Sequence, residues 1–176
     1  MWFRASDGQL RLVNTAYVQA VGAGSSEAAI AGGIELVEPV EGVSAVAEIL
    51  SDYPDVPLVA YMPNLSWVEE DEQQAYLDAF RELILPATEV LVGNHKTLTD
   101  FLLPDWDSER PASPRELAVA AAEHGTRFVL VTSVVLPNTK GPDQFLDNVL
   151  ASAQGAITGE KFERFDAAFV GAGDTL

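Results

Sequence analysis

The sequence predicts an α/β fold in which helices cover both faces of a mostly parallel sheet. Short apolar runs typical of buried strands alternate with longer segments whose apolar residues recur at helical spacing. This alternation is the pattern of repeated strand–helix–strand units. Near the end of the chain two strand-like segments flank a glycine turn, and this hairpin indicates an antiparallel addition at one edge of the sheet.

The first part of the chain, residues 1–35, is assigned to no part of this fold. Residues 10–18 have the β-branched and aromatic content of a strand, although their alternation is imperfect. The stretch 22–26, with its Gly-x-Gly, is typical of a flexible loop and only weakly indicates phosphate binding.

From residue 42 onward the elements follow in a clear order. Residues 43–50 predict a helix and residues 56–61 a buried strand. Ser66 and Glu69 have the spacing of a capping box, which predicts the start of a helix that ends near Pro86. The acidic run that begins at Glu69 favours a solvated helix start over a metal site, because the helix dipole stabilises negative charge there. The predicted apolar face of this helix is Tyr76, Leu77, Phe80, Leu83 and Ile84.

The second half contains the strongest strands. Residues 88–92 predict a strand, which Gly93, Asn94 and His95 follow at once, and residues 96–103 predict a short helix. A second capping box, Ser113–Glu116, predicts the start of a further helix, which ends at His124–Gly125. Residues 127–133 predict the buried strand that follows. The two strands of the hairpin are predicted at 147–150 and 161–165.

Composition restricts the class of protein. The chain has 176 residues, of which 48% are hydrophobic and 21% charged, and it has no cysteine. These values fit one globular domain, 1–176, and exclude disulfides and thiolate chemistry. The formal net charge of −17 argues against nucleic acid and anionic membranes as partners, because both are bound through clustered Lys and Arg. The start does not resemble a secretory signal and no apolar run is long enough to span a bilayer, so we expect a cytoplasmic protein.

Three separate stretches are predicted to meet at one ligand site. In open parallel sheets ligands bind outside the carboxyl ends of the strands. Asn94 follows one predicted strand, Thr132 and Ser133 end another, and the residues from Gly171 to Asp174 follow the hairpin. We therefore expect these residues to line one crevice.

The last eight residues carry the chemical signal. In Phe169-Val170-Gly171-Ala172-Gly173-Asp174-Thr175-Leu176 the glycines allow backbone N–H groups to point at one spot, and a helix start adds positive potential there. Such a site suits the charge of a transferring phosphoryl group, and Asp174 beside it is suited to accept the proton of an attacking hydroxyl. An Asx-type turn that caps a helix accounts for the tetrapeptide equally well.

Three segments resemble the ribokinase-like superfamily of small-molecule kinases. The last eight residues resemble its anion-hole and catalytic-base signature. Residues 82–94 resemble its "leucine-leucine-proline … threonine-proline-asparagine" segment, and residues 116–133 resemble the segment that presents a residue to the ATP phosphates. Within the superfamily the match is best to the hydroxymethylpyrimidine/phosphomethylpyrimidine kinase family of thiamine biosynthesis, with pyridoxal kinase as the near relative. The resemblance covers roughly residues 36 to 176 and is more specific for the superfamily than for the substrate.

This resemblance implies a ribokinase-like three-layer α/β/α fold, incomplete at both ends, and transfer of a phosphoryl group from ATP, with Mg²⁺, to hydroxymethylpyrimidine or its monophosphate. The implied site residues are Asp174 as the catalytic base, Gly171, Ala172 and Gly173 as the anion hole, and Asn94, Thr132 and Ser133 at the nucleotide. No side chain is assigned as a metal ligand. The expected partners are a small-molecule substrate and further copies of the same chain.

Three departures from the family pattern leave alternatives open. Thr97 stands where the family usually has the glutamate of Asn-x-x-Glu, and Tyr61 stands where it usually has the aspartate of Asp-Pro-Val. Phosphomethylpyrimidine kinases also often carry cysteine at the position of Asp174. A pyridoxal-type kinase is therefore the first alternative, and a non-catalytic binding or regulatory relative is the second.

The resemblance also implies that this chain is part of a larger kinase. Members of the superfamily begin with a segment that supplies most of the substrate pocket, and they continue past the glycine turn through helices that cover adenine. Neither part is recognisable here. We therefore expect residues 1–176 expressed alone to be oligomeric or unstable and to lack kinase activity, because an uncovered sheet face or edge associates.

Overall fold

The computed structural model describes residues 2–4, 10–12, 39–65, 68–134 and 145–163. The chain divides into two compact units, of which the first is Met1–Val56 with Leu65–Ile84 and the second is Pro57–Asn64 with Leu85–Leu176. The predicted strand residues 13–18, the loop 22–26 and the glycine turn 171–174 lie outside the described residues. The single domain expected for the whole chain stays a prediction.

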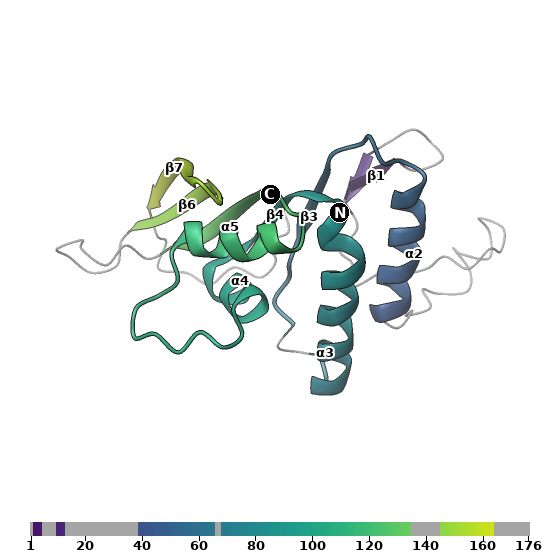
Figure 1. The fold of residues 1–176 in the computed structure, drawn as a ribbon, viewed down its shortest axis with the longest axis horizontal. Coiled ribbons are helices and arrows are strands. Elements are labelled where there is room, and N and C mark those ends of the chain that lie inside the picture. Colours follow the sequence, from purple (N-terminus) through teal and green to yellow (C-terminus); the bar gives the residue numbers. More distant parts are fainter. Residues whose placement is uncertain (1, 5–9, 13–38, 66–67, 135–144, 164–176) are drawn as a thin grey trace. The chain divides into compact units, whose positions relative to one another are not determined.

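The first unit contains a pair of packed helices. α2 (Pro39–Ser51) and α3 (Glu70–Ala79) lie side by side (Figure 1), and a π-helical turn, Phe80–Ile84, continues α3. Tyr76, Phe80 and Ile84 are buried, as the helical spacing predicts, whereas Leu83 is 42% exposed. The wider π-helical turn explains this difference, because it keeps the i+4 positions on the buried face and moves Leu83 off it. A short antiparallel pair, β1 (Trp2–Arg4) with β2 (Leu10–Leu12), also belongs to this unit.

The predicted start of α3 is wrong. The helix begins at Glu70, and Glu69 is its N-cap residue, with no side-chain hydrogen bond to the helix. Glu69 is therefore not the third helical residue that the predicted capping box requires, and Ser66 lies outside the described residues. The first turn holds Glu70, Asp71 and Glu72, whose charges are favourable beside the positive end of the helix dipole. This favourable interaction between the acidic side chains and the helix dipole accounts for a helix start at Glu70.

The second unit is built on a five-stranded mixed sheet in the order β3-β4-β5-β6-β7. β3, β4 and β5 run parallel, and β6 and β7 form an antiparallel hairpin at the edge next to β5, drawn in yellow-green in Figure 1. The strands are β3 (Leu58–Tyr61), β4 (Thr88–Asn94), β5 (Phe128–Val134), β6 (Phe145–Ser152) and β7 (Gly155–Glu163). The α/β class and the antiparallel addition at one edge are confirmed.

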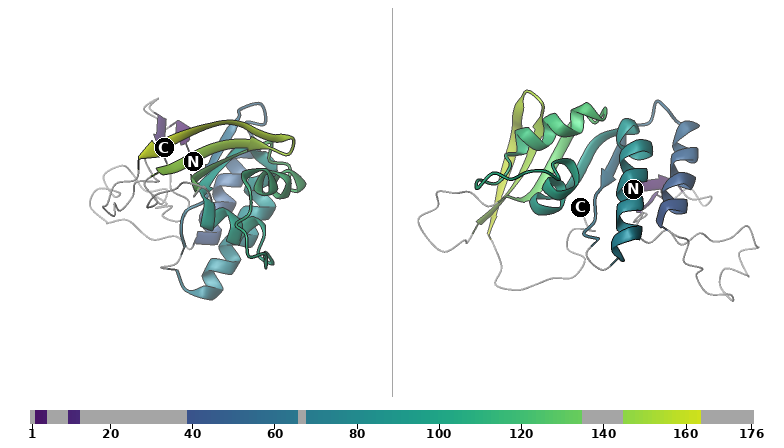
Figure 2. Two further views of the ribbon diagram at one scale, coloured as in Figure 1. Left: turned by 90° about the vertical axis from the view of Figure 1, so that its left-hand side faces the viewer. Right: turned by 60° about the horizontal axis from the view of Figure 1, so that its bottom comes forward.

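Two helices of this unit lie on the same face of the sheet (Figure 2). α4 (His95–Leu102) follows β4, and α5 (Pro114–Glu123) precedes β5; both contact β5 and each other. A 3-10 turn, Leu85–Ala87, leads into β4. The core between these helices and the sheet is formed by Leu91, Leu98, Phe101, Leu117, Val129 and Val131, all of them fully or almost fully buried. None of the helices described in either unit is long and apolar enough to cross a membrane.

The predicted capping box at the start of α5 is confirmed. The Ser113 hydroxyl accepts from the Glu116 N–H at 3.3 Å, and the Glu116 carboxylate accepts from the Ser113 N–H at 2.8 Å. Glu116 also pairs with the Arg110 guanidinium through both oxygens. These hydrogen bonds, from Arg110 first and Ser113 next, lower the pKa of Glu116 from 4.5 to about 2. The helix ends, as predicted, at a glycine with left-handed backbone, Gly125 (φ 96°).

The lowered pKa predicts how Glu116→Gln changes stability with pH. A carboxyl group whose pKa is lower in the folded state stabilises the protein above its unfolded pKa, and that stability is lost as the pH falls from about 5 to about 2. Glutamine can still close a capping box, so the substitution removes mainly the charge. We expect it to cost about 1 kcal/mol at pH 7, because the pair is partly solvated, and nothing near pH 2. Urea unfolding across this range measures the difference.

Glu123→Gln is the matched control, because Glu123 is exposed on the same helix and forms no ion pair within the described part of the chain. Its effect should vary little with pH. A cost of Glu116→Gln that stayed constant between pH 7 and pH 3 would contradict the assigned ion pair.

Gly93 allows the first turn of α4 to pack directly against the end of β4. A Cβ atom at this position would lie 2.9 Å from Leu98 Cγ and 3.0 Å from Leu98 Cδ2, and Leu98 is completely buried. We therefore expect Gly93→Ala to destabilise the protein by about 1–3 kcal/mol, as overpacking of a core does. Gly159→Ala is the control, because the nearest atoms there are 3.6 Å away. Equal losses of stability for Gly93→Ala and Gly159→Ala in thermal or urea unfolding would contradict this, because they would show that α4 can shift to accommodate the added methyl group.

Candidate functional site

The ends of β4 and β5 bring together the candidate residues that the structure describes. Asn94 and Thr132 are register partners on these adjacent parallel strands, at their carboxyl ends. The Thr132 hydroxyl donates to the carbonyl oxygen of Gly93 at 3.3 Å, which ties the two strand ends together. The predicted convergence of Asn94 with Thr132 and Ser133 is therefore present in the fold. We call these three residues the strand-end cluster.

Asn94 starts α4 and keeps hydrogen-bonding capacity. Its side-chain oxygen accepts from the Thr97 N–H at 2.8 Å, so it is the N-cap of the helix. Its side-chain NH₂ group forms no hydrogen bond with the described residues, and the residue is partly exposed. Free amide donors beside a helix N-terminus form a site that favours an anion.

Ser133 has a backbone conformation that is rare for a residue with a side chain. Its φ of 59° is left-handed, and it is the only non-glycine residue with positive φ in the described segments. Its N–H donates to the side-chain oxygen of Asn148 on β6 at 3.2 Å, and its own side chain is exposed. Sequence reasoning gave Asn148 no role.

The basic side chains near the start of α4 do not point to a ligand. His95 Nε2 donates to the carbonyl oxygen of Ala112 at 2.6 Å, which holds the helix start to the segment before α5. Lys96 pairs with Asp100 one turn along the helix and is otherwise exposed. Among the described residues, the groups that can offer positive potential at the strand-end cluster are backbone N–H groups and the Asn94 amide.

The described residues do not supply a ready metal site. They contain no group of three acidic or histidine side chains arranged to hold a metal ion. Thr97 follows Asn94 on α4, and Tyr61 ends β3, so neither position offers the carboxylate that the family resemblance would require.

The remaining predicted site residues are Gly171, Ala172, Gly173 and Asp174, which lie outside the described residues. Their convergence with the strand-end cluster stays a prediction.

β6 contains two polar residues that sequence reasoning missed. Asn148 bonds to Ser133, and the adjacent Asp147 has one buried side-chain oxygen, Oδ1, without a hydrogen-bond partner among the described residues. A buried acceptor of this kind is rare in folded proteins. The available signal was compositional, because Asp and Asn are both depleted in strands and here stand together between apolar residues.

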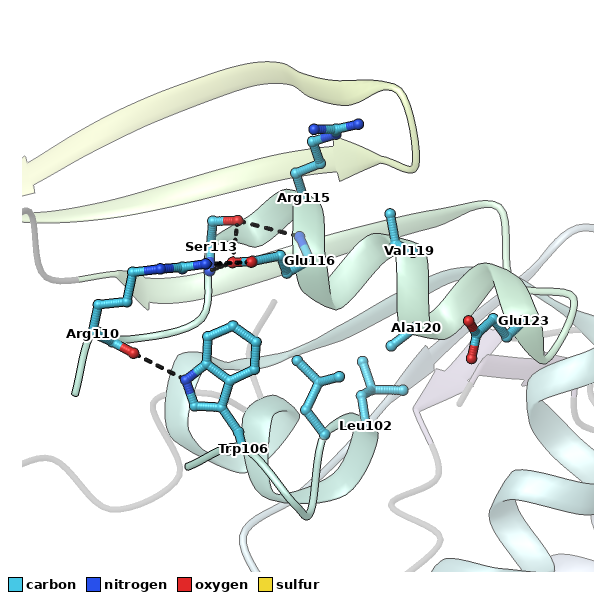
Figure 3. A pocket seen from close by; sticks show the side chains of 10 residues that line it. Leu102, Trp106, Arg110, Ser113, Arg115, Glu116, Val119, Ala120 and Glu123 are labelled. Carbon is cyan, nitrogen blue, oxygen red and sulfur yellow. Dashed lines mark hydrogen bonds and ion pairs between the residues drawn. The ribbon is translucent and has the colours of Figure 1, made fainter. Parts of the chain in front are cut away.

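The groove next to α5 is separate from the strand-end cluster. It has a volume of about 630 Å³ and lies between the end of α4, the segment after it and α5 (Figure 3). Several of its polar groups bond to one another or to backbone: Trp106 Nε1 donates to the Arg110 carbonyl at 2.9 Å, and Arg110 binds Glu116. Arg110 also lies over the Trp106 ring, 5.1 Å from its centroid. This arrangement fixes the segment before α5.

The described part of the chain is an α/β fold with a mixed sheet, helices and an antiparallel edge hairpin, and comparisons with solved structures confirm this fold class. A Bacillus subtilis pyridoxal kinase in an ADP complex matches with a TM-score of 0.56 and 19% identity, over 77% of this chain and 48% of that one. A Staphylococcus aureus pyridoxal kinase in complex with AMP-PCP and pyridoxal matches with a TM-score of 0.55 and 10% identity, over 81% and 51%. A Trypanosoma brucei pyridoxal kinase gives 0.50 and 16%, over 77% and 44%.

The chain thus spans about half the length of these kinases. At such identities the likeness establishes the fold. Neither a family model nor a curated protein sequence matches the chain significantly.

Proposed function

We propose that this chain is the nucleotide-binding part of an ATP-dependent small-molecule kinase. One observation carries the proposal: Asn94 and Thr132 lie side by side at the carboxyl ends of adjacent parallel strands, next to a helix N-terminus, in a fold shared with kinases that were solved with ADP and AMP-PCP. Ligands of open α/β sheets bind at such an edge. Phosphoryl transfer depends mostly on positioning and on electrostatic stabilisation, both of which fixed backbone donors can provide.

The proposal assigns a separate task to each part of the site. The Asn94 amide and the first turn of α4 would bind phosphate oxygens, and Thr132 and Ser133 would line the nucleotide. Gly171, Ala172 and Gly173 would stabilise the transferring phosphoryl group with their N–H groups. Asp174 would accept the proton of the substrate hydroxyl. ATP, with Mg²⁺ held through its phosphates, is the proposed donor.

The proposed acceptor is a hydroxymethyl group on a six-membered nitrogen heterocycle, or the phosphate that such a group already carries. Hydroxymethylpyrimidine, or its monophosphate, is the first candidate, because the best-matching motifs of the sequence resemble the kinases of that substrate. Pyridoxal is the second candidate, because pyridoxal kinases are among the matching structures, with TM-scores of 0.56 and 0.55. Both molecules present the same reacting group, so the choice depends on parts of the pocket that the strand-end cluster does not form.

Phosphorylation assays with the full-length protein test this function. The protein is incubated with ATP, Mg²⁺ and either hydroxymethylpyrimidine or pyridoxal, and the phosphorylated product is quantified by mass spectrometry. We expect ATP-dependent product from one acceptor with kcat/KM at least about tenfold above the other, a difference that a few pocket contacts can supply. AMP-PCP binding is measured in parallel by calorimetry. Binding without transfer to either acceptor would support the non-catalytic alternative, and the absence of both would refute the proposal.

A further inference from the structure

The end of β5 leaves the regular ladder with β6 where the nucleotide candidates stand. Val131 pairs with Val149 and Val134 pairs with Asp147, so two β5 residues, Thr132 and Ser133, lie opposite the single β6 residue Asn148. This two-against-one arrangement is a β-bulge. Bulges bend a strand and re-aim its side chains, and they are frequent beside active sites.

The bulge depends on a side chain for its hydrogen bonding. An extra residue in a strand leaves a backbone group without its usual ladder partner. Here the Ser133 N–H donates to Asn148 Oδ1 at 3.2 Å, so a side-chain carbonyl replaces the missing backbone acceptor. The left-handed backbone of Ser133, unfavourable for a residue with a Cβ atom, is stabilised by this contact.

The bulge is linked in turn to the end of β4. Thr132 donates its hydroxyl to the Gly93 carbonyl at 3.3 Å and is the register partner of Asn94. Two hydrogen bonds on adjacent β5 residues thus connect the three strands: Ser133 is bonded to Asn148 on β6, and Thr132 is bonded to Gly93 on β4. The position of the strand-end cluster is set in part from a strand outside the cluster.

We propose that Asn148 is a positioning residue for nucleotide binding, which holds the β5 bulge in the conformation that presents Thr132 and Ser133 to the nucleotide. This inference rests on the proposed kinase function. Asn148 acts through the backbone of Ser133 and does not itself touch the nucleotide. Loss of its side chain should therefore weaken nucleotide binding and leave the acceptor site unchanged.

A double-mutant cycle with Ser133→Gly separates positioning from a general structural role. Glycine adopts positive φ without penalty, so in the Ser133→Gly background the bulge no longer needs the contact with Asn148. With AMP-PCP as the probe, calorimetry on the full-length protein should show that Asn148→Ala raises Kd about five- to tenfold, the worth of one hydrogen bond. In the Ser133→Gly background the same substitution should raise Kd less than about twofold. Such a difference between the two backgrounds is an energetic coupling, which is expected only for residues that act together.

Thr158→Ala is the control, because Thr158 is an exposed polar residue of the same hairpin, opposite Leu150, outside the bulge. It should leave Kd unchanged, and Asn148→Ala should leave the KM of the acceptor unchanged. An equal rise in Kd in both backgrounds, or no rise in either, would overturn the positioning role while the kinase function stands. If the wild-type protein does not bind AMP-PCP, both the proposed kinase function and the positioning role of Asn148 are refuted.

Discussion

Asp174→Asn is expected to lower the turnover of the full-length protein by roughly a hundred- to ten-thousandfold, the usual contribution of a general base. Asparagine has nearly the same shape as aspartate but cannot accept the proton of the attacking hydroxyl. Nucleotide affinity should change little, because the substitution leaves the backbone N–H groups of the proposed anion hole in place. We therefore expect the loss of activity to appear in kcat, which is measured at saturating concentrations of ATP and of the acceptor.

Asp166→Asn is the control for charge, because it removes one negative charge from the same stretch of sequence. It should leave kcat within about twofold, since the proposed function gives Asp166 no part in proton transfer. Turnover of Asp174→Asn near that of the wild type would rule out Asp174 as the base. A comparable loss in Asp166→Asn would attribute the effect to charge rather than to proton transfer.

Local sequence patterns predicted most helices and strands correctly. Where such a pattern failed, neighbouring residues in the sequence explain the failure. The box at Ser113 and Glu116 formed as predicted, because proline at the first helical position leaves few other starts. The same four-residue spacing at Ser66 and Glu69 does not mark the start of α3, because the acidic residues that follow allow the helix to begin at Glu70. A capping-box spacing thus predicts a helix nearby more safely than it predicts the first residue.

The strand-end cluster was predictable because it follows from a rule of topology. Parallel strands end at the same edge, so residues after 88–92 and within 127–133 had to come close once both segments were recognised as strands. The roles of His95 and Asn148 were not predictable in this way. His95 is bound by the carbonyl of Ala112, and Asn148 binds Ser133, 15 residues earlier, across a bulge. Such contacts depend on loop paths and on strand register, which a single sequence does not specify.

Asn94 provides the test that best separates folding from nucleotide binding, because its two side-chain ends have different tasks. Its oxygen caps α4 through the Thr97 N–H, whereas its NH₂ group is proposed to bind phosphate. Asn94→Asp keeps the cap, since Asp and Asn are equally good N-cap residues, but it replaces the donors with a negative charge. Asn94→Ser keeps a cap and loses the donors without adding charge. Asn94→Ala loses both.

The three variants should therefore rank differently in stability and in affinity. In urea unfolding we expect Asn94→Asp and Asn94→Ser to stay near the wild type and Asn94→Ala to lose about 0.5–2 kcal/mol, the cost of a missing cap. In AMP-PCP calorimetry we expect Asn94→Ser to bind roughly ten- to hundredfold more weakly, as loss of a hydrogen bond to a charged group requires. Asn94→Asp should bind more weakly still, with the additional loss reduced by salt because it arises from charge repulsion. If affinity instead followed stability, with only Asn94→Ala impaired, Asn94 would be a helix cap and no more.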